Sequence, residues 1–477
     1  MGVESEREVL EPLSPITLSL STPKLTLYII SVFESEIPFN VDTLKSWITQ
    51  IMDCLNPRFC CTMVEKDRGE LRWKRVNLNI DDHFIVPKPP NGDSDTHDQH
   101  VKQYICDVSL KPLPMDRPLW EFHVLNWKTT CSPATLVVKV HHSVGDGVSM
   151  MSFLLDLAKR ADDPTKPISF PTSSSASGKA QFKNFRNVFS SVSSRIGGLV
   201  SGAWYSAIDV VDGLARSKLW VQDSNIPMRG PPGVEKLPVR ISQATMDLKE
   251  IKMVGKKLNA TVNDVLLGAI SYGLQKYLQL SLSKDERYKD PSVILEGLNV
   301  TSLVFFNARE DKGLQKPEMM FTSNSKAPWG NRIYFFLLPI PFGMPKDPTY
   351  FVKQASSSTK RSKSSLGVLL GRKFLVFKAR YRDPEVAASS FYNSMSSTTL
   401  ALSNMVGPKE KIAIEGHPIK DFSFFVTGIP LSLFLSVVSY MDHVNLRATG
   451  TKGYVDTETL CRCITEAFQE IKDSLVS

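Results

Sequence analysis

The sequence predicts an α/β protein built from two domains. Strand-like and helix-like patterns alternate in both halves of the chain, which is typical of this class. A region rich in Pro, Ser and Gly separates the two halves. The length of 477 residues, with 42% hydrophobic and 22% charged residues, suits two ordinary globular domains. These values exclude a disordered chain, a fibre and a polytopic membrane bundle.

The N-terminal half contains two predicted strands and two predicted helices. Residues 25–32 and 134–142 are apolar and rich in β-branched side chains, so we expect buried strands there. Residues 41–54 and 148–160 carry apolar side chains at helical spacing and are predicted to be helices. The second helix follows the second strand after a short turn.

The C-terminal half repeats this alternation. Helices are predicted at 247–257, 262–277 and 458–471, and strands at 298–307 and 331–339. Thr261 is expected to cap the second of these helices, because Asp264 follows at the third position.

The composition suggests where the domains meet. Residues 162–179 are rich in Pro and Ser, and residues 226–238 are rich in Pro and Gly. We therefore predict a first domain at 1–161, a linker at 162–238 and a second domain at 239–477.

Two apolar segments invite a test for membrane insertion. Residues 422–441 are long enough to cross a bilayer, but Gly428 and Pro430 interrupt them, so two buried strands around a turn are favoured. In residues 182–211, apolar side chains recur every three or four positions, which predicts an amphipathic helix. Such a helix could lie in a membrane interface or pack on the protein's own surface. The stripe consists of Phe182, Phe185, Phe189, Val192, Ile196, Leu199 and Ala203.

The net charge of +8 has a local origin. Residues 355–382 contain eight basic and no acidic side chains, and the remaining chain has equal numbers of both. This stretch could attract phosphates or an anionic membrane, or be a solvated face. We recognise no nucleic-acid-binding module. The seven cysteines show no C-x-x-C spacing, and the N-terminus has no secretory signal, so we expect a reducing compartment.

The most informative motif is HHSVGDG at 141–147. It follows a buried strand and precedes a helix, a position where catalytic groups are often found. Because side chains alternate along a strand, His141 and His142 should point to opposite faces. Gly145 and Gly147 are expected to supply positive φ angles around Asp146. A histidine with a pKa near 7 suits a base that acts on an alcohol.

Three other interpretations of this motif are possible. His141, His142 and Asp146 could hold a metal, although adjacent histidines diverge and no H-E-x-x-H accompanies them. A serine hydrolase needs G-x-S-x-G, which the chain lacks. A purely structural histidine pair is the third reading, and the strand–turn–helix context argues against it.

The chain resembles a known family at this motif and at four others. HHSVGDG matches the HHxxxDG signature of acyl-CoA-dependent acyltransferases, and the surrounding chain looks like the plant wax ester synthase/diacylglycerol acyltransferase family. The four further matches are Pro118–Trp120, Asn263–Asp264, Gly330–Arg332 and Ser403–Pro408. The similarity runs nearly from end to end.

The resemblance implies a fold and a reaction. The fold would be two chloramphenicol-acetyltransferase-like domains, each a mixed sheet with helices, around a central tunnel. His142 would be the general base and His141 would support it, while Asp146 would hold the loop beside Gly147. Wax esters or triacylglycerol would form from acyl-CoA in a ternary complex. No cofactor is implied, because acyl-CoA is a substrate.

Other residues have alternative roles under this resemblance. Asn263 and Asn331 could contact substrate or cap their elements, and Trp120 could contact substrate or pack in the core. Arg309 is a candidate partner for the Asp146 carboxylate.

The implied partners are a long-chain acyl-CoA, a fatty alcohol or diacylglycerol, and a membrane surface, without nucleic acid. Members of this family associate with the endoplasmic reticulum and sometimes with the plasma membrane. The resemblance therefore implies the same location here, with the active domains facing the cytosol. One alternative is a BAHD-type acyltransferase for small plant alcohols or amines. Its DFGWG motif is not matched by Asp421–Phe425 (DFSFF). A non-catalytic membrane lipid-binding protein is the other alternative.

Overall fold

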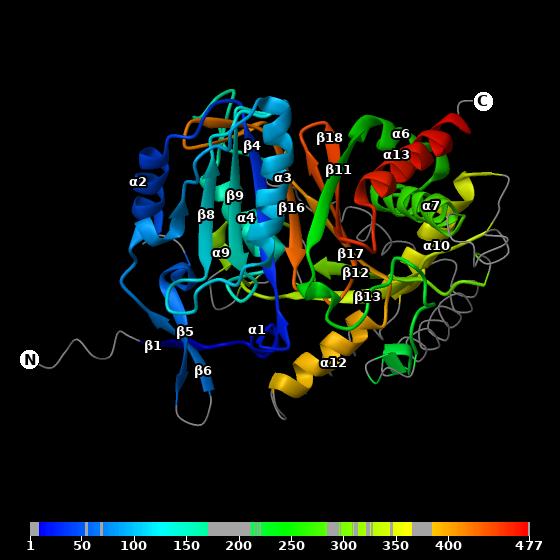
Figure 1. Ribbon diagram of the computed structural model, residues 1–477, viewed down its shortest axis with the longest axis horizontal. Helices are drawn as coiled ribbons and strands as arrows, with labels where there is room; N and C mark the ends of the chain where they lie inside the picture. Colours follow the sequence, from blue (N-terminus) through cyan, green and yellow to red (C-terminus); the bar gives the residue numbers. More distant parts are fainter. Residues whose placement is uncertain are drawn as a thin grey trace, which may run out of the picture.

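Two halves, each built on a β-sheet, lie side by side in the computed structural model (Figure 1). Each half has its own hydrophobic core. The structure describes residues 9–52, 56–66, 70–169, 211–213, 215–216, 218, 221–283, 295, 297–307, 309, 313–320, 325, 328–343, 347–364 and 384–475.

A seven-stranded sheet forms the N-terminal half. Its strands, in spatial order, are β10 (Lys159–Arg160), β15 (Ile412–Ile414), β16 (His417–Thr427), β4 (Tyr28–Ser35), β9 (Ala134–His141), β8 (Trp120–Leu125) and β7 (Phe84–Ile85). The central strand β4 pairs antiparallel with β16 on one side and with β9 on the other. Apolar β-branched and aromatic residues dominate these strands because both faces of the sheet are covered.

Helices cover both faces of this sheet. Helices α2 (Val41–Met52) and α4 (Gly147–Leu157) pack on the face that carries Val138 and Val140. Helix α3 (Ser94–Leu110) lies on the other face, where Lys139 Nζ donates to the Val108 carbonyl at 2.7 Å.

The C-terminal half contains a six-stranded sheet. In spatial order its strands are β11 (Val239–Asp247), β18 (His443–Thr451), β17 (Leu433–Tyr440), β14 (Leu400–Val406), β12 (Thr301–Asn307) and β13 (Ile333–Pro339). The helices of this half are α6 (Leu248–Leu258), α7 (Val262–Leu282), α10 (Thr349–Ser364) and α13 (Thr457–Asp473). Helix α13 packs against α7 (Figure 1).

The C-terminal half of the sequence contributes two strands to the N-terminal sheet. Both β15 and β16 come from the C-terminal half of the sequence, yet they complete the N-terminal sheet. Figure 1 shows β16, coloured orange, beside the blue strand β4. Phe422, Phe424 and Phe425 of β16 belong to the N-terminal core. The N-terminal sheet therefore needs residues that are made late in the chain.

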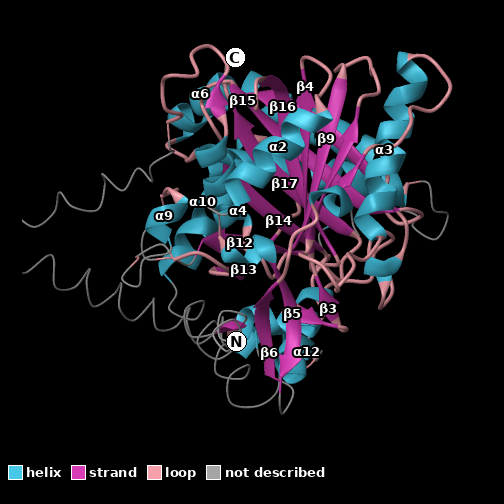
Figure 2. Cartoon of the chain, turned by 90° about the vertical axis from the view of Figure 1, so that its left-hand side faces the viewer, coloured by secondary structure: helices cyan, strands magenta, loops and turns pink. Residues whose placement is uncertain are grey.

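Smaller elements lie at one end of the molecule. Strands β5 and β6 and helix α12 project below the large sheets in Figure 2. The remaining elements are β1 (Val9–Pro12), α1 (Pro15–Ser19), β2 (Ser21–Thr22), β3 (Leu25–Thr26), η1 (Pro57–Cys60), β5 (Cys61–Lys66), β6 (Glu70–Arg75), η3 (Ile80–His83), η5 (Val234–Lys236), α9 (Pro317–Met320) and α12 (Pro384–Ser396).

Most predicted elements are confirmed, with corrections at their ends. Residues 422–441 contain strands β16 and β17, as the interrupted apolar pattern predicted. The helix expected at 148–160 was wrong at its end, because Lys159 and Arg160 leave the helix and pair with β15. Thr261 and Asp264 form the expected capping box. No helix among the described residues is long and apolar enough to cross a membrane.

Two predicted segments fall outside the described residues. The amphipathic stripe at 182–203 lies within the gap at 170–210. Of the basic stretch, the residues after 364 are also outside, and Lys360 and Arg361 lie near the end of α10.

Candidate functional site

The residues His141–Gly147, here called the histidine turn, connect strand β9 to helix α4. The His142 amide donates to the Leu27 carbonyl at 2.8 Å, and the His141 amide donates to the Leu119 carbonyl at 2.9 Å. The end of β9 is thus held by the chain on both sides. His142 continues the face of Val138 and Val140, whereas His141 continues the face of Lys139. The two imidazoles therefore diverge, as predicted.

The His142 ring is oriented by an asparagine from the other half of the molecule. Its Nδ1 lies 2.9 Å from Oδ1 of Asn331. The Asn331 amide nitrogen donates to the His142 carbonyl at 2.8 Å and to Thr17 Oγ1 at 3.1 Å, which fixes the amide orientation. Since Oδ1 can only accept, Nδ1 carries the proton and Nε2 keeps its lone pair. The ring is buried, and this burial lowers the pKa of His142 below its ordinary value.

His141 has a different environment. Its Nδ1 lies 2.7 Å from Ser143 Oγ and accepts the Ser143 amide at 3.1 Å. The ring meets Tyr28 edge-on, with centroids 5.3 Å apart. Burial lowers the pKa of His141 to about 3, so this ring stays neutral and shapes the turn.

Asp146 joins the histidine turn to the loop that carries Asn331. Its carboxylate accepts two bonds from Arg309, at 2.9 and 3.0 Å, and both side chains are fully buried. It also caps α4 through the Ser149 amide at 2.9 Å and accepts the Arg332 amide at 2.8 Å. Burial alone would raise the pKa of Asp146, but the Arg309 guanidinium prevails and holds it below the ordinary value. The expected pairing with Arg309 is confirmed.

The same arginine fixes the loop further. Arg309 donates to the carbonyls of Pro328 at 2.9 Å and Gly330 at 2.8 Å. Trp329 donates its indole N–H to the Val144 carbonyl at 2.9 Å. Residues 328–332 are therefore locked against the histidine turn, and Asn331 is held where it meets His142.

The expected role of the two glycines was wrong. Neither Gly145 nor Gly147 has a positive φ angle. Instead, neighbouring side chains approach both residues closely. A Cβ on Gly145 would lie 2.8 Å from Met150 Cε, and one on Gly147 would lie 2.7 Å from Met405 Sδ. Close packing at the start of α4, and not an unusual backbone conformation, explains these residues.

A cavity of about 300 Å³ opens beside His142. Its wall is mostly apolar, and His142, Asn307, Ser403, Asn404 and Tyr334 supply polar atoms. Gly147 and Val148, the first two residues of α4, also line it. The amides at a helix N-terminus carry partial positive charge, so this wall favours a developing negative charge near the imidazole.

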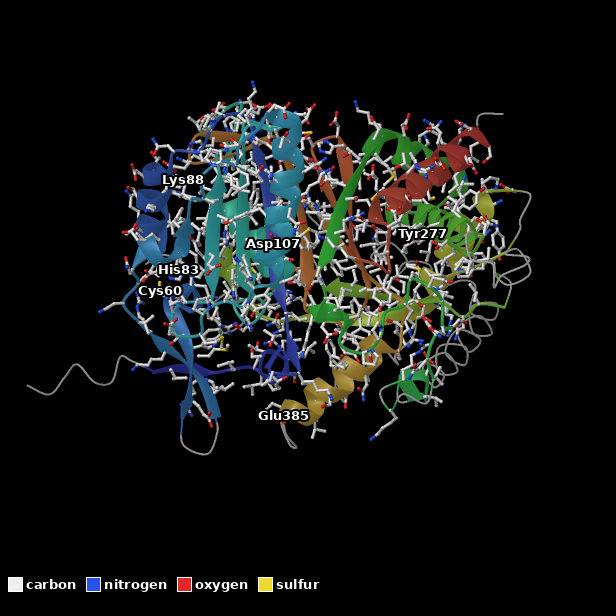
Figure 3. All side chains as sticks on the ribbon, viewed as in Figure 1. Cys60, His83, Lys88, Asp107, Tyr277 and Glu385 are labelled. Atoms are coloured by element: carbon white, nitrogen blue, oxygen red, sulfur yellow. The ribbon has the colours of Figure 1, made fainter. Side chains whose placement is uncertain are left out.

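The other predicted residues lie at different distances from this centre. Asn263 is the second residue of α7, and its Oδ1 accepts from Asn404 Nδ2 at 2.8 Å, so it reaches the cavity only through Asn404. Trp120 is buried, donates to the Phe59 carbonyl at 2.8 Å and stacks on His83. In Figure 3, His83 lies on the side of the sheet away from the C-terminal half. No group of three potential metal ligands occurs among the described residues.

Sequence reasoning did not identify every contributor. Thr17 accepts a hydrogen bond from Asn331, and Tyr334 lines the cavity beside His142. Neither residue belongs to a recognisable sequence motif. The orienting role of Asn331 was also missed, because its partner His142 is 189 positions away.

Comparisons with known proteins identify the family of the chain. A model of the wax ester synthase/diacylglycerol acyltransferase catalytic domain matches residues 62–266, and a model of the WS/DGAT C-terminal domain matches residues 329–472. Wax ester synthase/diacylglycerol acyltransferase 4 of Arabidopsis thaliana is 30% identical and aligns with 99% of this chain and 91% of that protein. Wax ester synthase/diacylglycerol acyltransferase 11 of Arabidopsis thaliana is 28% identical and aligns with 98% of this chain and 95% of that protein.

Two solved structures show the same fold. Wax ester synthase/diacylglycerol acyltransferase from Marinobacter aquaeolei VT8 has a TM-score of 0.59 at 14% identity, over 98% of this chain and 100% of that chain. The first condensation domain of the CDA synthetase has a TM-score of 0.56 at 13% identity, over 99% of this chain and 97% of that chain. The expected chloramphenicol-acetyltransferase-like fold is thereby confirmed.

Proposed function

This chain belongs to the wax ester synthase/diacylglycerol acyltransferase family, and we propose from that premise that it transfers a fatty acyl group from coenzyme A to a hydroxyl. The acceptor is a long-chain alcohol, a diacylglycerol or both. The observation that carries the proposal is the environment of His142. Its Nδ1 is held by Asn331 at 2.9 Å, and the ring lines an apolar cavity.

The geometry supports direct transfer in a ternary complex. The Nε2 lone pair of His142 removes the proton from the acceptor hydroxyl as its oxygen attacks the thioester carbonyl. A new C–O bond forms, and the carbonyl oxygen takes negative charge beside the N-terminus of α4. When the intermediate collapses, the C–S bond breaks, and the sulfur of coenzyme A leaves with the proton that His142 held. No bond to the protein forms.

The protein's own groups prepare this step before substrate arrives. Burial keeps the pKa of His142 low, so the imidazole is neutral and able to accept a proton at neutral pH. Asn331 holds the required tautomer. The buried pair of Asp146 and Arg309 fixes both the turn and the loop. The base therefore needs little rearrangement during the reaction.

A membrane surface is the expected source of the acceptor. Fatty alcohols and diacylglycerols partition into bilayers, and the net charge of +8 favours an anionic surface. We propose peripheral attachment at the endoplasmic reticulum, or at the plasma membrane, with the active site facing the cytosol where acyl-CoA is found. The amphipathic stripe at 182–203 is the proposed attachment segment. Replacing Phe185 and Phe189 by Ser should release the protein from microsomes, and unchanged partitioning would reject this attachment.

An acceptor competition tests the activity. Purified protein receives labelled palmitoyl-CoA with hexadecanol, dioleoylglycerol or a small water-soluble alcohol, and the labelled ester is measured. We expect ester with at least one of the two lipid acceptors. Ester with the small alcohol alone would indicate a soluble acyltransferase of another type. Binding of the lipids without any ester would indicate a non-catalytic protein.

A further inference from the structure

The cavity beside His142 contains polar groups that the proposed proton transfer does not use. Besides the base, four polar side chains line it, those of Asn307, Asn404, Ser403 and Tyr334. The two asparagines are engaged with the protein. Asn307 Oδ1 accepts from the Arg309 amide at 3.1 Å. Asn404 Nδ2 donates to Asn263 Oδ1 at 2.8 Å. The two hydroxyls, in contrast, have no hydrogen-bond partner within the described part of the chain.

Tyr334 carries its hydroxyl in an otherwise apolar setting. It belongs to strand β13, which pairs with β12 (Figure 1). Its ring meets Phe306 edge-on and stacks on Phe335, with centroids 6.3 and 5.0 Å apart. The hydroxyl oxygen is not among the polar atoms that the described residues enclose without a partner, so a ligand in the cavity can reach it. Burial raises the pKa of Tyr334 above its ordinary value of 10.0, and the phenol therefore keeps its proton and can donate.

An unpartnered hydroxyl in a mostly apolar cavity affects which ligand binds there. Water can satisfy the hydroxyl before a ligand enters. A hydrocarbon chain that displaces this water leaves the donor unpaired, and that desolvation weakens binding. A ligand that brings a carbonyl oxygen to the same place restores the hydrogen bond. The two hydroxyls therefore favour a ligand with acceptor groups over a purely aliphatic one.

The two classes of acceptor differ in this respect. A long-chain alcohol has one polar group, the hydroxyl that His142 deprotonates, and the rest of the molecule is hydrocarbon. A diacylglycerol has, within a few bonds of its free hydroxyl, two ester carbonyls that accept hydrogen bonds. The carbonyl of the acyl donor is already served by the N-terminus of α4. Two unused donors in the wall thus match the two ester carbonyls of a diacylglycerol.

We propose that Tyr334 and Ser403 donate hydrogen bonds to the ester carbonyls of a diacylglycerol and so make the cavity selective for this acceptor over long-chain alcohols. The inference rests on the proposed function and adds the residues that choose between its two acceptors. Neither hydroxyl takes part in the proton transfer. The acyl chains of so bulky an acceptor need a way out, and Val406 provides it, because this residue lines the cavity and is 57% exposed at the surface.

A pair of acceptors that differ only in the carbonyls provides the test. Palmitoyl-CoA is the donor, and 1,2-dioleoylglycerol is compared with 1,2-di-O-oleylglycerol, in which two ether linkages replace the esters. The unmodified protein should prefer the diester. Tyr334→Phe removes the hydroxyl alone, so kcat/KM for the diester should fall about fivefold, as expected for one lost hydrogen bond, while that for the diether stays the same. The loss should appear in KM and not in kcat, because the bond is made before and during transfer alike.

Two further variants and a third acceptor complete the design. Ser403→Ala should lower the preference for the diester in the same direction. Tyr392→Phe is the matched control, because this tyrosine of α12 does not line the cavity and its hydroxyl donates to Glu235 at 3.3 Å. It should leave the preference unchanged. With hexadecanol, Tyr334→Phe should keep or raise kcat/KM, since no donor is then left unpaired. Urea unfolding midpoints show whether each variant is folded.

The outcomes separate this inference from the proposed function. If the unmodified protein makes no ester with any acceptor, the proposed function itself fails. If it makes ester from hexadecanol but none from dioleoylglycerol, the function stands and the inference is overturned. An equal ratio of diester to diether rates in the unmodified protein and in Tyr334→Phe would also overturn it. An equal loss with all three acceptors would show that the phenol acts on the shared acyl-CoA, which likewise rejects the inference.

Discussion

The histidine turn after β9 and a second turn after β18 both connect a strand to a helix over the same number of residues, but their surroundings differ. The second, residues 451–457, is here called the lysine turn. In each, a strand ends, four residues turn, and an aspartate caps a helix, with Asp146 accepting the Ser149 amide at 2.9 Å and Asp456 accepting the Thr459 amide at 3.2 Å. Helix α13 then packs on α7, where Figure 3 labels Tyr277.

The side chains of the two turns differ in burial and in partners. At the position of His142 the lysine turn has Lys452, which is exposed and donates to Gln103 at 3.2 Å. Asp456 is exposed, whereas Asp146 is buried against Arg309. In both units the aspartate caps the following helix, so the strand–turn–helix arrangement by itself accounts for helix capping and nothing more. The histidine turn differs in that it is buried and held by Arg309 and Asn331 from the opposite half, and the proposed reaction depends on that difference.

The largest expected difference between the turns is in turnover. His142→Ala should lower the rate of ester formation by a factor of about 10² to 10⁴, the usual contribution of a general base. Lys452→Ala should leave the rate unchanged, because Lys452 is exposed and does not line the cavity beside His142. Initial rates with palmitoyl-CoA measure both, and circular dichroism checks folding. A folded His142→Ala protein with most of its activity would contradict the assignment of the base.

The two aspartates should differ in their contribution to stability. Asp146→Asn leaves the buried Arg309 without a counter-charge, so the free energy of unfolding should fall by about 3–5 kcal/mol. Asp456→Asn should change it by about 0.5 kcal/mol or less, because Asn caps helices nearly as well as Asp. Urea unfolding measures both, and equal losses would mean that capping explains both residues.

Much of the fold could be predicted because its signals are local. The strand at 134–141 and the capping box at Thr261 follow from neighbouring residues. The pairing of β16 with β4 could not be predicted, since no local pattern in β16 indicates which strand it pairs with. Helix α3 was missed because its sequence is largely polar, and its position depends on contacts that only the folded chain provides.

The candidate site also combines residues that are predictable from a local motif with contacts that only the folded chain brings together. His142, Asp146 and Gly147 are neighbours in one motif, and the pairing of Asp146 with Arg309 was expected. The partner of His142 was not, because Asn331 meets it only after the two halves associate. The reason for Gly147 also lies in the tertiary contact with Met405 and not in the backbone angles of the turn.

A smaller effect is expected at the last position of each turn. Gly147→Ala would place a carbon 2.7 Å from Met405 Sδ in the wall of the cavity, and because the Met405 side chain can move, kcat/KM should fall by less than about tenfold, equivalent to less than roughly 1.4 kcal/mol. Adding Met405→Ala should recover part of this loss. The lysine turn already has Thr457 there, hydrogen-bonded to Ser242 at 2.8 Å, and Thr457→Ala should affect stability but not turnover. No recovery in the double variant would exclude the clash as the cause.

The smallest expected effect concerns pH. The ordinary pKa of a histidine is 6.5. Because burial lowers the pKa of His142, its ring stays neutral at pH values where an exposed histidine already begins to take up a proton. Lowering the pH from about 7.5 to about 6 should therefore reduce kcat/KM by less than protonation of an ordinary, exposed histidine would. The folded state should lose stability as the pH falls below 6.5, since unfolded histidines take up protons first. A steep loss of activity near pH 6.5, without unfolding, would contradict a buried base.

The late position of β16 in the sequence affects how the N-terminal sheet can form during translation. Strand β9, which ends in the histidine turn, pairs with β4, and β4 pairs in turn with β16 at residues 417–427. During translation, the first 400 residues are synthesised before β16. The backbone groups on one edge of β4 therefore have no partner strand for most of that time. A premature stop codon even 60 residues from the end would therefore remove part of the sheet that supports His142.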